Sequence, residues 1–263
     1  MKKIDDTWNS SDPYEYFMGR WSTLIAPEFL DWLNAPHHLA WLDVGCGTGA
    51  LSEAIYRKCQ PATLCCMDPS AGFLEKAKER LSGAADFIIG DASHIQKVNH
   101  SFDIVVSGLA LNFFPDLTPA FSEMKRVLRE KGTIAAYVWD YADRMEFLRL
   151  FWDAACALDP DARNLDEGVR FPICHPNNLS NAFEEAGLKY VATTYLQINT
   201  IFRNFDDYWN PFLGGQGPAP GYLASLPEQL QQELKAKVQK KLPFEKDGSI
   251  RLLARAIAVQ GKI

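Results

Sequence analysis

The most constraining stretch of this chain is an apolar segment that ends abruptly in a run of glycines. Residues 39–44 read Leu-Ala-Trp-Leu-Asp-Val, and residues 45–49 read Gly-Cys-Gly-Thr-Gly. Apolar residues at helical spacing resume at Leu51, Ala54 and Ile55, so the pattern predicts a strand, a tight loop and a helix. Glycine permits positive φ and has no Cβ, so a ligand can lie directly against such a loop. The stretch predicts the opening of a nucleotide-binding α/β domain.

The same loop limits which nucleotide it can hold. The dinucleotide fingerprint requires a glycine at its sixth position, where this chain has Ala50, and the Gly-Lys-Ser/Thr of a P-loop is absent. Asp43 lies two residues before the first glycine. Its carboxylate would repel a pyrophosphate and attract an ammonium or a sulfonium. The loop therefore predicts a cationic ligand.

Two further predicted strands also end on acids. Residues 63–67 lead into Asp68-Pro69-Ser70, about 20 residues after the glycine loop, where a carboxylate accepts both hydroxyls of a ribose. Residues 86–90 lead into Asp91 and Ala92. Three successive strand ends that each carry an acid indicate one shared binding edge.

Residues 42–49 resemble the first motif of the class I methyltransferases that use S-adenosyl-L-methionine, a ligand with both an ammonium and a sulfonium. The resemblance covers residues 35–140 and is closest to the small-molecule subgroup, which includes quinone-ring and ubiquinone-biosynthesis-like enzymes (methyltransferase type 11). It implies an α/β fold with a Rossmann-like seven-stranded sheet, mostly parallel with an antiparallel last strand, and helices on both faces. It also implies S-adenosyl-L-homocysteine as the product.

The resemblance carries specific roles onto this chain. Asp68 would bind the ribose and Asp91 the adenine amino group. The aromatic segment 14–21 would fold over the ligand as a lid, with Arg20 paired to the methionyl carboxylate; the other interpretation of Arg20 is a surface salt bridge. The full predicted cofactor set is Arg20, Asp43, Gly45, Cys46, Gly47, Thr48, Gly49, Asp68, Pro69, Ser70, Asp91, Ala92, Ser93, Gly108 and Leu109.

The length of 263 residues suits one large domain or a core with additions. We predict a single domain that comprises an N-terminal helical lid (1–34), a cofactor-binding core (35–140), two substrate-cap insertions (141–176 and 203–249), and the rest of the sheet (177–202 and 250–263). Within it, a strand is expected at 133–139 after Gly132, and a loop at 168–172.

Substrate chemistry is expected in the loop that leaves the fourth strand, residues 108–116. DNA amino-methyltransferases carry an Asn/Asp-Pro-Pro-aromatic motif there and cytosine methyltransferases need a nearby cysteine; neither is present. A net charge of −6 without a basic run also argues against nucleic acid. The apolar residues 109–114 favour a small hydrophobic or aromatic acceptor.

The catalytic residue is not identified by the sequence. His175, Tyr141 and Asp140 are candidate general bases, and His175 is equally readable as a structural residue that precedes a helix. The six cysteines contain no C-x-x-C pair and are interpreted as reduced, packed thiols, and no metal site is expected.

No apolar run reaches the roughly 18 residues that span a bilayer, and the N-terminus lacks a signal-peptide pattern. We therefore expect no membrane insertion and a cytoplasmic location. Two other functions stay open. One is a non-catalytic S-adenosylmethionine-binding protein of the same fold. The other is a dinucleotide-dependent oxidoreductase, which Asp43 and Ala50 disfavour.

Overall fold

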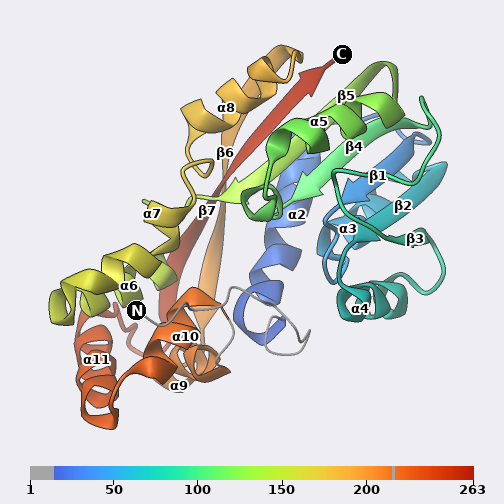
Figure 1. Cartoon of the computed structure of the whole chain (residues 1–263). Helices are drawn as coiled ribbons and strands as arrows, with labels where there is room; N and C mark the ends of the chain where they lie inside the picture. The colour runs from blue at the N-terminus through green and yellow to red at the C-terminus, as the bar shows by residue number, and fades with distance from the viewer. Residues whose placement is uncertain (1–14, 215–216) are drawn as a thin grey trace. The chain divides into compact units, whose positions relative to one another are not determined.

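The computed structural model describes residues 15–214 and 217–263, and a seven-stranded sheet runs through them (Figure 1). The strand order is β3-β2-β1-β4-β5-β7-β6; six strands are parallel and β7 is antiparallel. The strands are β1 (Ala40–Val44), β2 (Thr63–Asp68), β3 (Asp86–Ile89), β4 (Phe102–Gly108), β5 (Leu128–Trp139), β6 (Lys189–Phe202) and β7 (Ile250–Lys262). The predicted fold class is confirmed.

Strand β1 lies at the centre of the parallel part of the sheet. It pairs with β2 on one side and β4 on the other, so that Asp43 lies opposite Cys66 and Val106. All five of its residues are buried, as expected for a strand covered on both faces. Because the chain order reverses between β1 and β4, this is the point where open α/β sheets bind ligands, beyond the carboxyl ends of the strands.

The chain divides into two compact units. The larger contains Gly19–Val138, Ile173–Leu196 and Ala256–Ile263, and the smaller contains residues 15–18, Trp139–Pro172 and Gln197–Arg255. The helices of the larger unit are α2 (Arg20–Leu33), α3 (Ala50–Cys59), α4 (Ala71–Leu81), the 3-10 turn η2 (Leu111–Phe113), α5 (Leu117–Val127) and α8 (Pro176–Glu185). The predicted lid and cap roles of the N-terminal segment and insertions stay predictions, and Tyr14 lies outside the described residues.

Helices of the larger unit pack in pairs on the sheet. Helix α2 packs against α3, and Lys58 Nζ lies 2.6 Å from Asp31 Oδ1 across that contact. The ring of Phe29 lies 4.6 Å from that of Tyr137 on β5. Helix α5 contacts α8 through the rings of Phe121 and Phe183, 5.0 Å apart. The contact with α2 positions α3, which follows the glycine loop.

The smaller unit has its own aromatic core. Its helical elements are η1 (Glu15–Gly19, which ends in the larger unit), α6 (Glu146–Leu158), η3 (Pro160–Leu165), α7 (Glu167–Arg170), α9 (Phe205–Trp209), η4 (Asn210–Gly214), α10 (Pro218–Ser225) and α11 (Glu228–Lys241). The rings of Phe151 and Phe212 stack 4.7 Å apart, and the Tyr208 hydroxyl donates to the Phe147 carbonyl. None of the helices within the described ranges has the length and apolar character needed to cross a membrane.

Two local predictions were wrong. Strand β5 begins at Leu128, five residues before the predicted start, and Gly132 lies inside it. Leu128 pairs with Phe102, and a register shift with a positive φ at Lys131 (63°) lets the strand continue through the irregularity. Residues Glu167–Arg170 form the short helix α7 and not a loop, because the Asp166 carboxylate caps it by accepting the N–H of Gly168 at 2.8 Å.

Candidate active site

The glycine loop between β1 and α3 is tied to the neighbouring strand. The N–H groups of Gly45 and Cys46 both donate to the Met67 carbonyl on β2, at 2.8 and 3.0 Å. The N–H of Gly49 donates to the Cys46 carbonyl at 2.9 Å, and all three glycines have positive φ (74°, 55° and 86°). Cys46 and Thr48 are buried. The loop is therefore a fixed turn at the carboxyl end of β1.

The three glycines differ in what surrounds them. A methyl group added at Gly45 would lie 2.7 Å from Ala110 Cβ, and one added at Gly49 would lie 3.1 Å from Ala77 Cβ. A methyl group at Gly47 would meet no atom within 4 Å. Packing therefore excludes side chains at the outer two positions, whereas Gly47 faces open space.

Asp43 is a fully buried acid at the penultimate position of β1. Its Oδ2 accepts a hydrogen bond of 2.6 Å from Ser52 Oγ on α3, and its Oδ1 has no partner among the described residues. Burial raises the pKa of Asp43 to about 7; the Ser52 hydrogen bond opposes the rise and the nearby Asp68 adds to it. A positively charged partner would stabilise the ionised form of this buried carboxyl.

Asp68 is the last residue of β2, and it joins the loop to the next helix. Its Oδ2 accepts the N–H of Gly47 at 2.9 Å, and its Oδ1 accepts the N–H of Ser70 at 2.8 Å. Burial raises the pKa of this carboxyl, and the two backbone hydrogen bonds counteract the rise. Pro69 is exposed, and Ser70 caps α4 by accepting the N–H of Phe73 at 3.3 Å.

Asp91 follows β3 and is exposed. Its Oδ1 accepts the N–H of Ser93 at 2.7 Å, and hydrogen bonds from Ser93 lower its pKa. The N–H of Gly90 donates to the Asp68 carbonyl at 3.2 Å, which links this turn to β2. Ala92 is half-buried and Ser93 exposed. The three acids thus lie at or just after the carboxyl ends of three adjacent strands.

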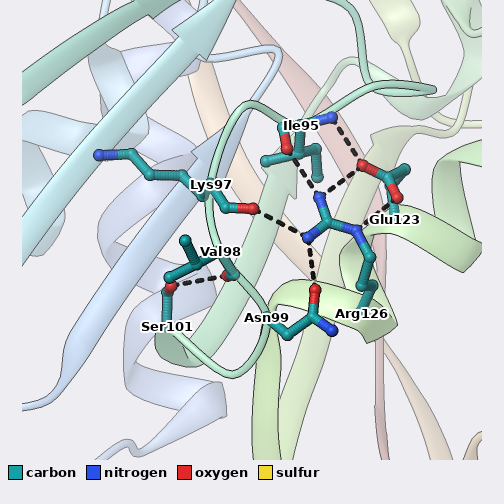
Figure 2. Close-up of polar contacts among 7 residues, drawn as sticks. All are labelled: Ile95, Lys97, Val98, Asn99, Ser101, Glu123 and Arg126. Carbon is teal, nitrogen blue, oxygen red and sulfur yellow. Dashed lines mark hydrogen bonds and ion pairs between the residues drawn. The ribbon is translucent and has the colours of Figure 1, made fainter.

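The loop after Ser93 is held by an ion pair on α5 (Figure 2). The Arg126 guanidinium donates to the carbonyls of Ile95 and Lys97, at 2.7 and 2.8 Å, and to Asn99 Oδ1 at 2.8 Å. It also forms two hydrogen bonds with Glu123, whose carboxylate in turn accepts the N–H of Ile95 at 2.9 Å. The planar guanidinium suits this set of acceptors. This pair was not among the predicted site residues, although Glu123 and Arg126 show the i, i+3 spacing that would have indicated it.

The end of β4 is closely packed against β5. A methyl group at Gly108 would lie 2.8 Å from the Tyr137 hydroxyl oxygen, and the N–H of Leu109 donates to the Tyr137 carbonyl at 2.7 Å. Leu109 has a positive φ of 59°, which is uncommon for a bulky residue and costs free energy. Backbone strain of this kind concentrates at functional sites.

The remaining predicted residues lie as follows. Arg20 is the first residue of α2, and its guanidinium lies 4.2 Å from the Trp21 ring centroid. His175 is exposed immediately before α8, without a side-chain cap to that helix. In the smaller unit, Asp140 is buried and accepts a 2.7 Å hydrogen bond from Arg255 Nε, and Tyr141 is buried against Phe171. Asp140 is thus engaged in an ion pair, and a base role for any of the three stays untested.

Comparison with known proteins matches the same part of the chain. Residues 42–136 match a family described as a methyltransferase domain. This chain contains a methyltransferase domain. The match begins in β1 and ends in β5, so the methyltransferase domain includes the glycine loop, all three strand-end acids and the end of β4. The sequence-based resemblance to the S-adenosylmethionine-dependent methyltransferases is confirmed over residues 42–136, and the predicted fold class is confirmed by the sheet.

Relatives of the methyltransferase domain act in different reactions. A malonyl-[acyl-carrier protein] O-methyltransferase of Yersinia pestis is 38% identical over 93 residues, which is 35% of this chain and 34% of the relative. A demethylmenaquinone methyltransferase of Leptospira interrogans is 34% identical over 140 residues, 50% of this chain and 53% of the relative. The chain spans about half or less of the length of the curated relatives it matches.

Solved structures support the fold over a longer range. A putative methyltransferase from Bacillus halodurans superimposes with a TM-score of 0.56 at 16% identity, covering 90% of this chain and 97% of that one. A phosphoethanolamine N-methyltransferase of Haemonchus contortus was solved with phosphomonomethylethanolamine and S-adenosylhomocysteine. It superimposes with a TM-score of 0.56 at 14% identity, covering 95% of this chain and 56% of that one. At these identities the similarity establishes the fold of the methyltransferase domain and not its acceptor.

Proposed function

We propose that this protein transfers a methyl group from S-adenosyl-L-methionine to a small hydrophobic or aromatic acceptor. The observation that carries the proposal is the buried Asp43 carboxylate, one oxygen of which has no partner among the described residues. It lies two residues before the glycine loop, in which Gly47 faces open space. A buried carboxylate favours a cation and disfavours a pyrophosphate, so it suits an aminoacyl sulfonium and not a dinucleotide.

The strand ends suggest a role for each part of the ligand. Asp43 would face the ammonium, and the glycine loop would lie along the methionyl and ribose portions. Asp68 would accept the ribose hydroxyls, since each carboxylate oxygen keeps a lone pair beyond the one used by the backbone. Asp91 would accept the adenine amino group. The other predicted contacts are Arg20 with the methionyl carboxylate, and Cys46, Thr48, Pro69, Ser70, Ala92, Ser93, Gly108 and Leu109.

The reaction itself needs alignment more than a covalent contribution from the protein. Methyl transfer from a sulfonium is an in-line displacement that releases a neutral thioether, so the protein must align the nucleophile and exclude water. A general base is needed only where the nucleophile carries a proton near neutral pH. His175 stays the candidate for that role.

The acceptor class rests on the loop after β4 and on the relatives. Residues 109–114 read Leu-Ala-Leu-Asn-Phe-Phe, with Leu111 buried and Phe113 44% exposed. One relative is named a demethylmenaquinone methyltransferase, and another a malonyl-[acyl-carrier protein] O-methyltransferase. The apolar loop favours the first kind of acceptor.

Calorimetric titration with S-adenosyl-L-homocysteine, NAD and NADP tests the cofactor. We expect saturable binding of the first and none of the other two; the reverse pattern would mean a dinucleotide enzyme. Incubation with S-adenosylmethionine carrying a labelled methyl and a metabolite panel then tests turnover. Tight binding without transfer to any acceptor would favour the non-catalytic alternative.

A further inference from the structure

A single polar side chain interrupts the apolar loop after β4. Asn112 lies in the middle of η2, and both its amide nitrogen and its amide oxygen are buried without a hydrogen-bond partner among the described residues. A buried polar group left unpaired costs about 1–3 kcal/mol. Asn112 therefore contributes little to the stability of the ligand-free protein.

The turn that carries Asn112 packs on the glycine loop. A methyl group at Gly45 would lie 2.7 Å from Ala110 Cβ and 3.5 Å from the Phe114 ring, the residues on either side of η2. The strained Leu109 precedes the turn. Asn112 is therefore fixed at the carboxyl ends of β1 and β4, where the methyl donor of the proposed function would lie.

Other buried polar atoms near these strand ends are also unpaired. Asp43 Oδ1 on β1 has no partner among the described residues, and Asp43 lies opposite Val106 on β4. Ser107 Oγ is also without a partner there, but Ser107 follows Val106 and so points to the other face of the sheet. Native proteins keep such atoms mainly where water, an ion or a ligand satisfies them. The Asn112 amide and Asp43 Oδ1 are therefore the atoms at these strand ends that a ligand with polar groups would satisfy.

The chemistry of the amide narrows that ligand. A carboxamide presents a donor and an acceptor side by side, so it pairs best with a group that presents an acceptor and a donor on one edge. Vicinal hydroxyls, or a hydroxyl beside a carbonyl, have this arrangement. The adjacent residues in the sequence, Leu111 and Phe113, are apolar, which suits an acceptor whose remaining surface is an apolar ring.

We propose that Asn112 is an acceptor-binding residue, and that the methyl acceptor is an aromatic molecule with two adjacent oxygen functions held by the Asn112 amide. This inference rests on the proposed function, because it places the acceptor beside the same glycine loop. It adds the substrate feature that the enzyme recognises and the residue that recognises it.

Two ring probes that differ in one hydroxyl test the pairing: catechol and phenol, titrated into the protein saturated with S-adenosyl-L-homocysteine. We expect the wild type to bind catechol about tenfold more tightly than phenol, and the Asn112→Leu variant to lose most of that preference. The matched control is Asn177→Leu, the same change at an exposed position on α8. It should retain the wild-type preference.

A second measurement separates a binding role from a structural one. Because the amide has no hydrogen-bond partner among the described residues, Asn112→Leu should unfold at the same temperature as the wild type or higher, and its affinity for S-adenosyl-L-homocysteine should be unchanged. A clear fall in unfolding temperature would assign Asn112 to the fold and overturn the inference. So would equal binding of the two probes, or no binding of catechol, by the loaded wild type. Failure of S-adenosyl-L-homocysteine itself to bind would instead reject the proposed function.

Discussion

The backbone N–H of Gly47 donates a 2.9 Å hydrogen bond to Asp68 Oδ2, although 21 positions separate the two residues. The bond joins the turn after β1 to the end of β2. A ligand that touches the open side of Gly47 would therefore also meet the Asp68 carboxylate. This relationship makes the two residues the most direct tests of the site.

The open space at Gly47 gives the first prediction. Gly47→Ala should lower the affinity for S-adenosyl-L-homocysteine by at least about tenfold, because the new methyl group would occupy space that the ligand needs. The backbone strain should cost only about 1–2 kcal/mol of unfolding free energy. Calorimetry and urea denaturation measure the two effects.

The control for that change is Gly83→Ala. Gly83 also has a positive φ (83°) and no atom within 4 Å of an added Cβ, but it follows α4 and is remote in sequence from the predicted contacts. It should show the same loss of stability with wild-type affinity. Equal affinities of the two variants for S-adenosyl-L-homocysteine would show that the ligand does not contact Gly47.

The second prediction concerns Asp68. Asp68→Asn keeps a carbonyl oxygen for one backbone N–H but removes the charge, and Asp68→Ala removes both. We expect affinity for S-adenosyl-L-homocysteine to fall about 10- to 100-fold in the first variant and further in the second, since a hydrogen bond to a charged group contributes about 1.5–3 kcal/mol. Calorimetry with Asp86→Asn, an exposed acid at the start of β3, is the comparison. Wild-type affinity in Asp68→Ala would show that the ribose contact is misplaced.

The third prediction follows from the pKa of Asp43, which burial raises from 3.8 to about 7. When the pKa of an acid is higher in the folded state than in the unfolded state, its contribution to the free energy of unfolding is complete below the unfolded-state pKa. That contribution is lost as the pH rises from about 4 through 7. The ligand-free Asp43→Asn variant should therefore gain stability relative to the wild type as the pH rises from about 5 to 8. Urea denaturation across that range measures the difference.

The same group should couple ligand binding to protons. A bound ammonium would favour the ionised carboxylate, so binding of S-adenosyl-L-homocysteine near neutral pH should release a proton and tighten as the pH rises from about 5.5 to 7.5. Binding enthalpies in buffers of different ionisation enthalpy report that proton. The dependence should vanish in Asp43→Asn; if it persists there, another group titrates.

The fourth prediction concerns the Arg126 clamp, the set of hydrogen bonds by which the Arg126 guanidinium holds Glu123 and residues 95–99. Arg126→Ala removes the donors that hold residues 95–99, and it should cost about 2–4 kcal/mol of unfolding free energy. Arg126→Lys should recover only part of that loss, because an ammonium cannot reproduce the planar set of donors. The amide hydrogen-exchange rate should increase most in residues 95–99 of the variants. If these residues are as protected in the variants as in the wild type, Arg126 does not hold this loop.

The clamp also has a pH signature. Hydrogen bonding to Arg126 lowers the pKa of Glu123 from 4.5 to about 2. A lowered acid pKa contributes stability above about pH 4.5 that is lost as the pH falls through 2. The wild type should therefore lose more stability than Glu123→Gln between about pH 5 and 3.

Much of this protein was determined by local sequence. The glycine loop needed positive φ at three positions, and apolar runs lead into Asp43, Asp68 and Asp91, so the parallel sheet and the placement of these acids at the ends of three strands were predictable. That this edge binds the ligand stays a prediction. The start of β5 was not, because its first residues pair across an irregular register that depends on Phe102. A strand that begins in charged residues carries no periodic signal.

What only the tertiary structure decided are the relationships between distant side chains. The sequence alone could not show that Ser52 satisfies one oxygen of Asp43 or that Arg126 holds the loop after Asp91. Nor could it show that the amide of Asn112 is buried without a partner among the residues that the structure describes. Secondary structure follows from patterns within a few residues. Hydrogen-bond partners and desolvation depend on which elements pack together, and that information is spread over the whole chain.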